Sequence, residues 1–380
     1  MSASDRTRTS DRNGIRPPFR LRWTPVLVAV LIVMLAACAS RPGSTVLEPA
    51  DVKPGGRTVT IFVATLRTPE PGTTSSFNSV QSPTLRFARY VVSIPPAHRP
   101  GAIEWPRDRP DRATDFVTIE SARLSEAEFR SGIAAAPGGG RSVRLFVHGY
   151  NNSYPESIYR LAQIAADAHD DRVAVLFAWP SKASALAYAA DRAAASASTD
   201  GLARTIEILA QSSGGGNTLL AHSMGAWLTV QTLSKMSPER RQAVFARYSN
   251  IVLAAPDIDV AEMVRRLETI GRLPRPLTLL VSSDDKALTM AGILTGGRRV
   301  GVDDVHDPWV QAAAKRYGVR VVDISELTTA DSFLHGRFTA MVALYSKFQS
   351  QIENPSGRHF AGPGVFVFRA RTSTLEPIGR

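Results

Sequence analysis

Short apolar runs recur along the chain from residue 142 onward, and stretches with helical spacing of apolar residues separate them. Because these runs are nearly continuous in hydrophobic residues, they are typical of strands in a parallel sheet that helices cover on both faces. The sequence therefore predicts an α/β fold with a mostly parallel central sheet. The predicted strands cover residues 142–147, 173–179, 218–221, 251–255, 277–281 and 319–324.

The residues before 142 predict an antiparallel edge of the same sheet. Two further strands, at 59–66 and 87–94, are expected to form its antiparallel leading part, and the Pro-, Arg- and Asp-rich stretch 98–115 is expected to be loop. Residues 182–212 begin rich in alanine and continue with helical spacing, which predicts a helical cap. This cap is either a moving lid or a plain covering helix. Residues 352–380 are expected to be a C-terminal tail.

The turn at Ser223 carries the clearest chemical signal. The strand at 218–221 runs directly into this serine, and a helix is predicted at 226–234. A strand that turns so sharply into a helix tolerates only small residues two positions either side of the serine, here Ala221 and Gly225. Such a turn presents the hydroxyl at a helix N-terminus, where backbone N–H groups can bind an oxyanion. The pattern predicts a nucleophile elbow in which Ala221 replaces the usual glycine.

A second turn could complete the oxyanion site. The strand at 142–147 ends in His148-Gly149-Tyr150-Asn151, and a His-Gly pair after a strand is a usual place for a backbone donor. We predict that the N–H of Tyr150, or alternatively of Asn151, acts with the N–H of Met224, the residue after the serine. The simpler interpretation is an ordinary Gly/Asn turn.

A base and an acid follow in the order that a serine triad requires. Carboxylates follow the strand at 277–281, and His335 lies in a polar loop after the last predicted strand, at 319–324. Ser, acid and His in this chain order are typical of α/β-hydrolases. A histidine, whose unperturbed pKa is about 6.5, can take and return the serine proton, while a carboxylate holds the ring in the correct tautomer. The histidines that we consider less suitable are His98, His148, His169, His222, His306 and His359.

Spacing leaves the acid open. Asp284 and Asp285 cannot be separated by position, and both could be simple turn residues. Asp257 follows the preceding strand and stays the alternative. Asp259, with Glu262 three residues later, is interpreted as a helix N-cap.

Together these segments make the chain similar to bacterial α/β-hydrolases of the esterase/lipase superfamily whose function is uncharacterised. The resemblance covers roughly residues 58 to 350. It implies a serine hydrolase with Ser223 as nucleophile, a strand-terminal aspartate and His335, it favours Asp285 through its Asp-Lys-Ala-Leu context, and it implies no particular substrate. The segments that carry it are Phe62-Val63-Ala64-Thr65-Leu66-Arg67, Val92-Ser93-Ile94-Pro95, His98-Arg99-Pro100-Gly101, His148-Gly149-Tyr150-Asn151, Trp179-Pro180-Ser181 with Tyr188 and Asp191, Ala221-His222-Ser223-Met224-Gly225, Ala255-Pro256-Asp257, Asp285-Lys286-Ala287-Leu288, and His335.

The N-terminus predicts export. An arginine-rich stretch precedes an apolar run at 26–37, and the single cysteine, Cys38, follows Leu35-Ala36-Ala37. The Leu-Ala-Ala-Cys sequence resembles the bacterial lipobox, in which the cysteine becomes the acylated first residue of the mature protein. We therefore expect a signal peptide at 1–37, a lipidated cysteine with a flexible tether at 38–57, and a hydrolase domain at 58–351. The protein is then held by its lipid on a membrane of the bacterial cell envelope, facing the periplasm or the exterior.

Composition and motifs argue against nucleic-acid, nucleotide and metal binding. The net charge of +11 fits a solvated basic surface, and without interleaved aromatic and basic residues we expect no nucleic-acid partner. The glycine clusters at 138–140 and 214–216 lack the following Lys-Ser/Thr of a phosphate loop, and no metal-binding motif is present in the sequence, so no cofactor or metal is expected.

The predicted function is therefore a membrane-anchored serine hydrolase that cleaves carboxylic esters through an acyl-enzyme. Three alternatives use the same sequence features. The triad could serve a thioesterase or amidase, or an acyltransferase, or the site could be degenerate and the protein an interaction lipoprotein of the envelope. The substrate is expected to be an ester or another acyl compound, and the sequence implies no particular acyl length or oligomeric state.

Overall fold

The computed structural model describes residues 41–51, 53, 55–106, 109–136, 142–168, 170–273, 275–327, 339, 363–369 and 374–378. The chain divides into two units, Met1–Arg41 and Pro42–Arg380, and nearly all described residues belong to the second. The predicted signal peptide, Cys38 and His335 lie outside the described residues. Among the helices that are described, none is long and apolar enough to cross a membrane.

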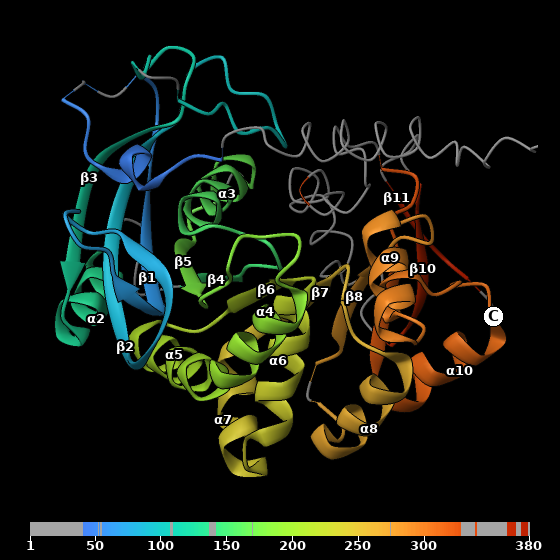
Figure 1. Ribbon diagram of the computed structural model, residues 1–380. Coiled ribbons are helices and arrows are strands. Elements are labelled where there is room, and N and C mark those ends of the chain that lie inside the picture. Colours follow the sequence, from blue (N-terminus) through green and yellow to red (C-terminus); the bar gives the residue numbers. More distant parts are fainter. Residues whose placement is uncertain are drawn as a thin grey trace, which may run out of the picture. The chain divides into compact units, whose positions relative to one another are not determined.

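The described strands form one sheet in the order β11-β10-β9-β8-β7-β6-β4-β5-β1-β2-β3 (Figure 1). All pairs from β10 to β1 are parallel, whereas β2, β3 and β11 join antiparallel at the two edges. The predicted fold class, with an antiparallel leading edge, is confirmed. The strands are β1 (Thr58–Pro69), β2 (Phe77–Ser93), β3 (Val117–Leu124), β4 (Val143–Val147), β5 (Val173–Ala178), β6 (Asn217–His222), β7 (Tyr248–Ala254), β8 (Leu277–Val281), β9 (Val319–Asp323), β10 (Gly364–Arg369) and β11 (Thr374–Pro377).

Helices cover both faces of this sheet. Successive residues of each strand point to opposite faces, so Leu145 and Val147 of β4 join one buried cluster while Phe146 joins the other. The first cluster is closed by α2 (Glu126–Ala135), α4 (Tyr188–Ala197), α5 (Thr199–Ser212), α6 (Met224–Lys235), α7 (Pro238–Arg247), α8 (Val260–Ile270) and α10 (Pro308–Tyr317). The second is closed by α3 (Tyr154–Asp167) and η1 (Ser44–Leu47); α9 (Lys286–Thr295) and η2 (Val300–Val302) follow β8.

Two terminal segments differ from the sequence expectation. We expected a flexible tether up to residue 57, but Leu47 is fully buried in the second cluster and the carbonyl of Val46 accepts a hydrogen bond from Tyr159 of α3. We expected a tail from residue 352, but its described part forms β10 and β11. The reason is the short apolar run at 365–368, which is buried against the edge of the sheet at β9.

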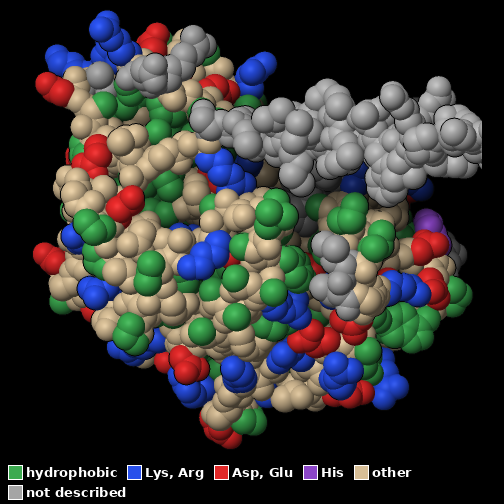
Figure 2. Space-filling model, in the orientation of Figure 1, with side chains coloured by type: hydrophobic (Ala, Val, Ile, Leu, Met, Phe, Trp, Pro, Cys, Tyr) green, Lys and Arg blue, Asp and Glu red, His purple; other side chains and the backbone are tan. Residues whose placement is uncertain are grey.

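The segment expected to be a cap is held to the body of the domain. Helix α5 buries Leu202 and Ile206 in the first cluster, as a covering helix does. Helix α4 is tied down by Arg192, whose guanidinium lies 3.8 Å from the centre of the Trp227 ring and donates to Glu262 at 3.1 Å. On the face shown in Figure 2, basic side chains lie among acidic ones, which is the arrangement of a solvated surface.

Candidate active site

Ser223 occupies the turn between β6 and α6 in a backbone conformation that side-chain-bearing residues rarely adopt. Its φ is 53° and its ψ is −121°, and it is one of four described non-glycine residues with positive φ. The surroundings enforce this geometry, because the N–H of Ser223 donates to the carbonyl of Ala254 at 2.9 Å and its own carbonyl accepts from the N–H of Asp257 at 3.3 Å. Strain that neighbouring contacts maintain is typical of functional sites, and a strained serine at a strand-to-helix turn is the geometry of a nucleophile elbow.

Two glycines let the elbow approach the end of β4. A Cβ at Gly225 would lie 2.4 Å from the carbonyl oxygen of His148, so only glycine fits there. A Cβ at Gly149 would lie 2.8 Å from Nδ1 of His222 and 3.1 Å from Cβ of Ser223. The loop that follows β4 therefore lies directly against Ser223.

We call the loop at residues 148–152 the oxyanion loop, after its predicted role. Its hydrogen bonds distinguish the two backbone N–H groups that are candidate donors to an oxyanion. The N–H of Asn151, which has a φ of 59°, donates to the carboxylate of Asp191 at 3.3 Å. The side-chain amide of Asn152 donates to the carbonyl of Tyr150 at 2.8 Å and fixes the orientation of that peptide unit. Because the Asn151 N–H is directed at Asp191, the N–H of Tyr150 is the better candidate. Met224 is the first residue of α6, where an N–H has no acceptor within its own helix.

His148 has a structural place rather than a catalytic one. Its ring stacks on that of Trp179, with centroids 4.8 Å apart, and its two nitrogens face the carbonyls of Gly149 and Trp179 at 2.9 and 3.0 Å. Burial, together with the positive charge of Arg67, lowers the pKa of His148 to about 3. The ring is therefore neutral at physiological pH and holds the start of the oxyanion loop against β5.

Asp191 is a site-supporting residue that sequence reasoning did not assign. It is fully buried on α4 and accepts hydrogen bonds from the hydroxyl of Ser181 and the N–H of Lys182, both at 2.6 Å, in addition to that of Asn151. It thereby joins the loop after β5 to the oxyanion loop. The Trp179-Pro180-Ser181 segment and Asp191 were visible in the sequence, but their contact was not.

Asp257, the alternative acid, is engaged by two side chains. Its Oδ2 accepts a hydrogen bond from the hydroxyl of Tyr188 at 2.7 Å, and its Oδ1 lies 3.2 Å from Nε of Arg299. The atoms of this second contact are not aligned for a hydrogen bond, so we describe it as an ion pair between two buried groups. Burial, and then the charge of Asp257, raises the pKa of Tyr188, which keeps its hydroxyl a donor. The Tyr188 ring also stands edge-on to that of Tyr150, with centroids 5.3 Å apart.

Asp285 and Asp284, which spacing could not separate, differ in burial. Asp284 is exposed, whereas Asp285 is fully buried at the start of α9. The Oδ1 of Asp285 accepts the N–H of Leu288 at 3.0 Å, so the side chain is an N-cap as well as a candidate acid. Its relation to His335 lies outside the described residues. Asp259 is confirmed as an N-cap, because it accepts the N–H of Glu262 at 3.1 Å.

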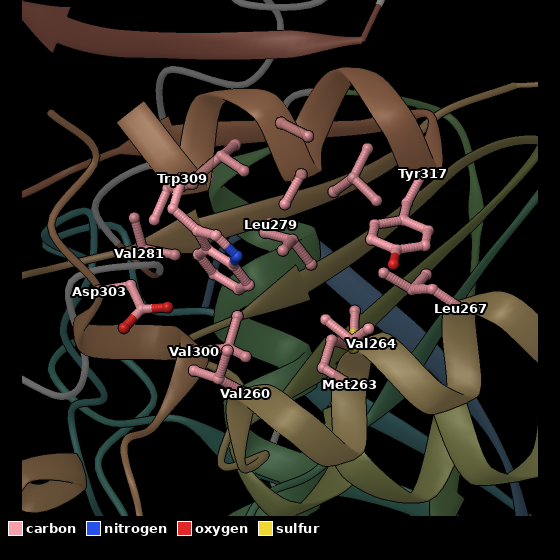
Figure 3. Close-up of a pocket in the computed structure, with 15 residues that line it drawn as sticks. Val260, Met263, Val264, Leu267, Leu279, Val281, Val300, Asp303, Trp309 and Tyr317 are labelled. Carbon is pink, nitrogen blue, oxygen red and sulfur yellow. The ribbon is translucent and has the colours of Figure 1, made fainter. Parts of the chain in front are cut away.

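An apolar cavity is lined by none of Ser223, Asp257 and Asp285. It has a volume of about 60 Å³ and lies between α8, α10 and the strands β8 and β9. Figure 3 shows Met263 and Leu267 of α8 facing Trp309 and Tyr317 of α10 across it. Since neither Ser223 nor Asp285 lines it, this cavity, one wall of which is the partly exposed Trp309, is not part of the candidate site. Within the described ranges, no group of three or more His, Cys, Asp or Glu side chains is arranged to hold a metal ion.

Comparison with known proteins identifies the family. Residues 125–352 match the family described as "Alpha/beta hydrolase of unknown function (DUF900)", which is more than half of the chain. The chain belongs to this family. Its α/β-hydrolase fold agrees with the parallel sheet and with the strand-to-helix turn at Ser223.

Esterase structures are also similar to this DUF900 hydrolase, at low scores. Esterase Est2 of Thermogutta terrifontis has a TM-score of 0.35 and 14% identity, covering 71% of this chain and 90% of its own. The monoclinic form of a Pyrobaculum calidifontis esterase has a TM-score of 0.34 and 13% identity, covering 87% of this chain and 98% of its own. Likeness at this level says nothing about substrate. A search of curated proteins found no significant match.

Proposed function

We propose that the chain is a serine hydrolase that cleaves carboxylic esters through an acyl-enzyme, with Ser223 as nucleophile, His335 as base and Asp285 as the acid that orients His335. The observation that carries this proposal is the strained backbone of Ser223 at the β6–α6 turn, against which Gly149 of the oxyanion loop is packed. Asp285 is preferred over Asp257 because both oxygens of Asp257 already face Tyr188 and Arg299.

The proposed chemistry follows from these positions. His335 takes the proton of the Ser223 hydroxyl as its oxygen attacks the ester carbonyl carbon, and the carbonyl oxygen becomes an oxyanion that the N–H groups of Tyr150 and Met224 stabilise. His335 then returns the proton to the leaving alcohol as the C–O bond breaks, which leaves the acyl group on Ser223. Water, deprotonated by the same histidine, releases the acid and restores the serine.

Serine labelling tests the nucleophile. A fluorophosphonate should label Ser223 alone, and Ser223→Ala should abolish labelling and ester turnover while the protein stays folded. Ser234→Ala is the matched control, because Ser234 lies on the same helix and its hydroxyl donates to the carbonyl of Gln231 and accepts from Arg266, neither of which contacts Ser223 in the structure. Labelling at another serine, or none in folded protein, would contradict the proposal. A panel of esters of varied acyl length would then define the substrate class.

We also propose that a lipid on Cys38 anchors the enzyme to a membrane of the bacterial cell envelope. The support is the Leu35-Ala36-Ala37-Cys38 sequence after an apolar run, with no other cysteine in the chain. Mass spectrometry of the mature N-terminal peptide should find Cys38 acylated, and Cys38→Ser should leave an unacylated precursor. A mature N-terminus elsewhere, or an unmodified Cys38, would overturn this proposal.

A further inference from the structure

Arg67, near the end of β1, is a buried cation with few partners. Its side chain is 1% exposed, yet its guanidinium makes only two long hydrogen bonds, to the carbonyls of Asn152 at 3.4 Å and Asn78 at 3.5 Å. Its carbon Cζ also lies 5.7 Å from the centre of the Tyr154 ring. Among the described residues, its Nε has no hydrogen-bond partner and no carboxylate lies within ion-pair distance.

Two other buried arginines, Arg144 and Arg299, each have a carboxylate partner. Arg144 on β4 is paired with Asp170, and Arg299 is paired with Asp257. An unpaired buried charge is costly because it loses its hydration without gaining an opposite charge. Burial lowers the pKa of Arg67 to about 10, against the smaller opposing effects of Tyr154 and of the Asp191 carboxylate, which lies beyond ion-pair distance. The side chain is therefore still protonated at neutral pH. A polar group that a folded protein buries without a full set of partners calls for a functional explanation.

The contacts of Arg67 lead to the candidate site. Arg67 donates to the carbonyl of Asn152, the amide of Asn152 donates to the carbonyl of Tyr150, and Gly149 next to it touches Ser223. The charge of Arg67 also reaches this loop, because it contributes to the lowered pKa of His148. The cation therefore contacts one end of the loop, at Asn152, while the other end, at Gly149, touches Ser223, where the oxyanion of the proposed reaction would form.

We propose that Arg67 is a positioning residue for the oxyanion loop, and that its unpaired positive charge stabilises the negative charge that develops on the substrate carbonyl oxygen. The proposal rests on the proposed serine-hydrolase function. A neutral ester gains little from this charge, whereas the tetrahedral intermediate gains directly. Arg67 thus acts on kcat rather than on KM.

Removal of the charge with little change of size tests the proposal. In Arg67→Met, kcat should fall about tenfold, the scale of a unit charge acting over several ångströms in a protein, while KM stays within about twofold. A trifluoromethyl ketone forms an anionic hemiketal with Ser223, so its affinity should fall by the same factor as kcat/KM. Arg144→Met is the matched control: it breaks a buried arginine pair on β4, which β5 separates from β1 in the sheet, and should lower the melting temperature but leave kcat unchanged.

A lysine variant separates charge from packing and provides a second test if the methionine variant does not fold. Arg67→Lys should keep most of the wild-type kcat at neutral pH. Between about pH 7 and pH 9 its kcat should then fall, as the buried lysine loses its proton, while the wild-type rate stays nearly level because Arg67 has a pKa of about 10. Equal losses in both variants, or a methionine variant with wild-type kcat and inhibitor affinity, would overturn the role of Arg67. If the wild-type protein itself neither reacts with a fluorophosphonate nor turns over esters, the proposed function fails and this role fails with it.

Discussion

Asp257 and Asp285 follow neighbouring parallel strands, and both are buried, but their surroundings differ. Asp257 faces a phenol and a guanidinium that hold its two oxygens. Asp285 faces the N-terminus of a helix, where the N–H of Leu288 occupies one oxygen. The difference shows that burial at the end of a strand does not by itself mark an acid that orients a histidine. What matters is whether a carboxylate oxygen is already paired with another side chain or can still accept a hydrogen bond from a histidine.

Another buried aspartate, Asp167, does contact a histidine but cannot be the acid of a triad. Asp167 on α3 lies 3.1 Å from Nε2 of His98, and Glu104 lies 2.8 Å from Nδ1 of the same ring. This histidine has carboxylates on both nitrogens, so it has none left to accept a proton from a serine. An Asp–His contact therefore does not by itself define a triad. Substitution of Asp257 and of Asp285 is needed to identify the acid that orients the catalytic histidine.

The largest effect is expected from Asp285→Asn. If Asp285 orients His335, this variant should lower kcat by about 10⁴, because the histidine tautomer becomes wrong while the geometry is kept. Stability should change little, because asparagine caps a helix about as well as aspartate. Ester kinetics and a melting curve measure both effects. A dead Asp257→Asn beside a nearly wild-type Asp285→Asn would reverse our assignment.

Asp257→Asn should show the opposite pattern. It removes one charge of a buried ion pair and leaves Arg299 without its counter-charge, which should lower the free energy of unfolding by about 3 kcal/mol. The amide oxygen can still accept from Tyr188, so kcat should fall less than about tenfold. Urea unfolding and ester kinetics on the same preparation separate the two effects. Unchanged stability would show that the pair with Arg299 contributes little.

The sequence predicted the features that depend on neighbouring residues. Continuous apolar runs located the parallel strands, small residues around Ser223 indicated the elbow, and the spacing of Asp259 and Glu262 identified a helix cap. Contacts between distant residues were not predictable. Asp191 meets Asn151 across 40 residues of sequence and Arg67 meets Asn152 across 85, and neither has a local signal. Spacing likewise left Asp284 and Asp285 open, and only the resemblance favoured Asp285; the difference in their burial is visible in the structure alone.

A smaller effect is expected from Tyr188→Phe. The change removes only the hydroxyl that donates to Asp257, so the free energy of unfolding should fall by about 1 kcal/mol. Tyr248→Phe is the matched control, because its buried hydroxyl donates to the carbonyl of Ile206, away from both aspartates. Similar stability losses with unchanged kcat in both variants would place Tyr188 in the scaffold. A selective loss of kcat in Tyr188→Phe would instead give the Asp257 cluster a part in the reaction.

The smallest effect is expected in the pH dependence of the free energy of unfolding, through His98 and its two carboxylate partners. Burial alone would lower the pKa of His98, but hydrogen bonds to Asp167 and Glu104 and the charges of these groups outweigh burial and raise it. A pKa raised in the folded state means that protonated His98 stabilises the fold fully below its unfolded pKa of about 6.5, and that this stabilisation is lost as the pH rises through the folded value. Between about pH 6 and pH 9 the wild-type protein should therefore lose more free energy of unfolding than His98→Gln, whose side chain does not titrate. Urea unfolding of both proteins across this range measures the difference. Parallel curves for the two proteins would mean that the carboxylates do not raise the pKa of His98. A changed kcat in His98→Gln would contradict the view that His98 takes no part in the reaction.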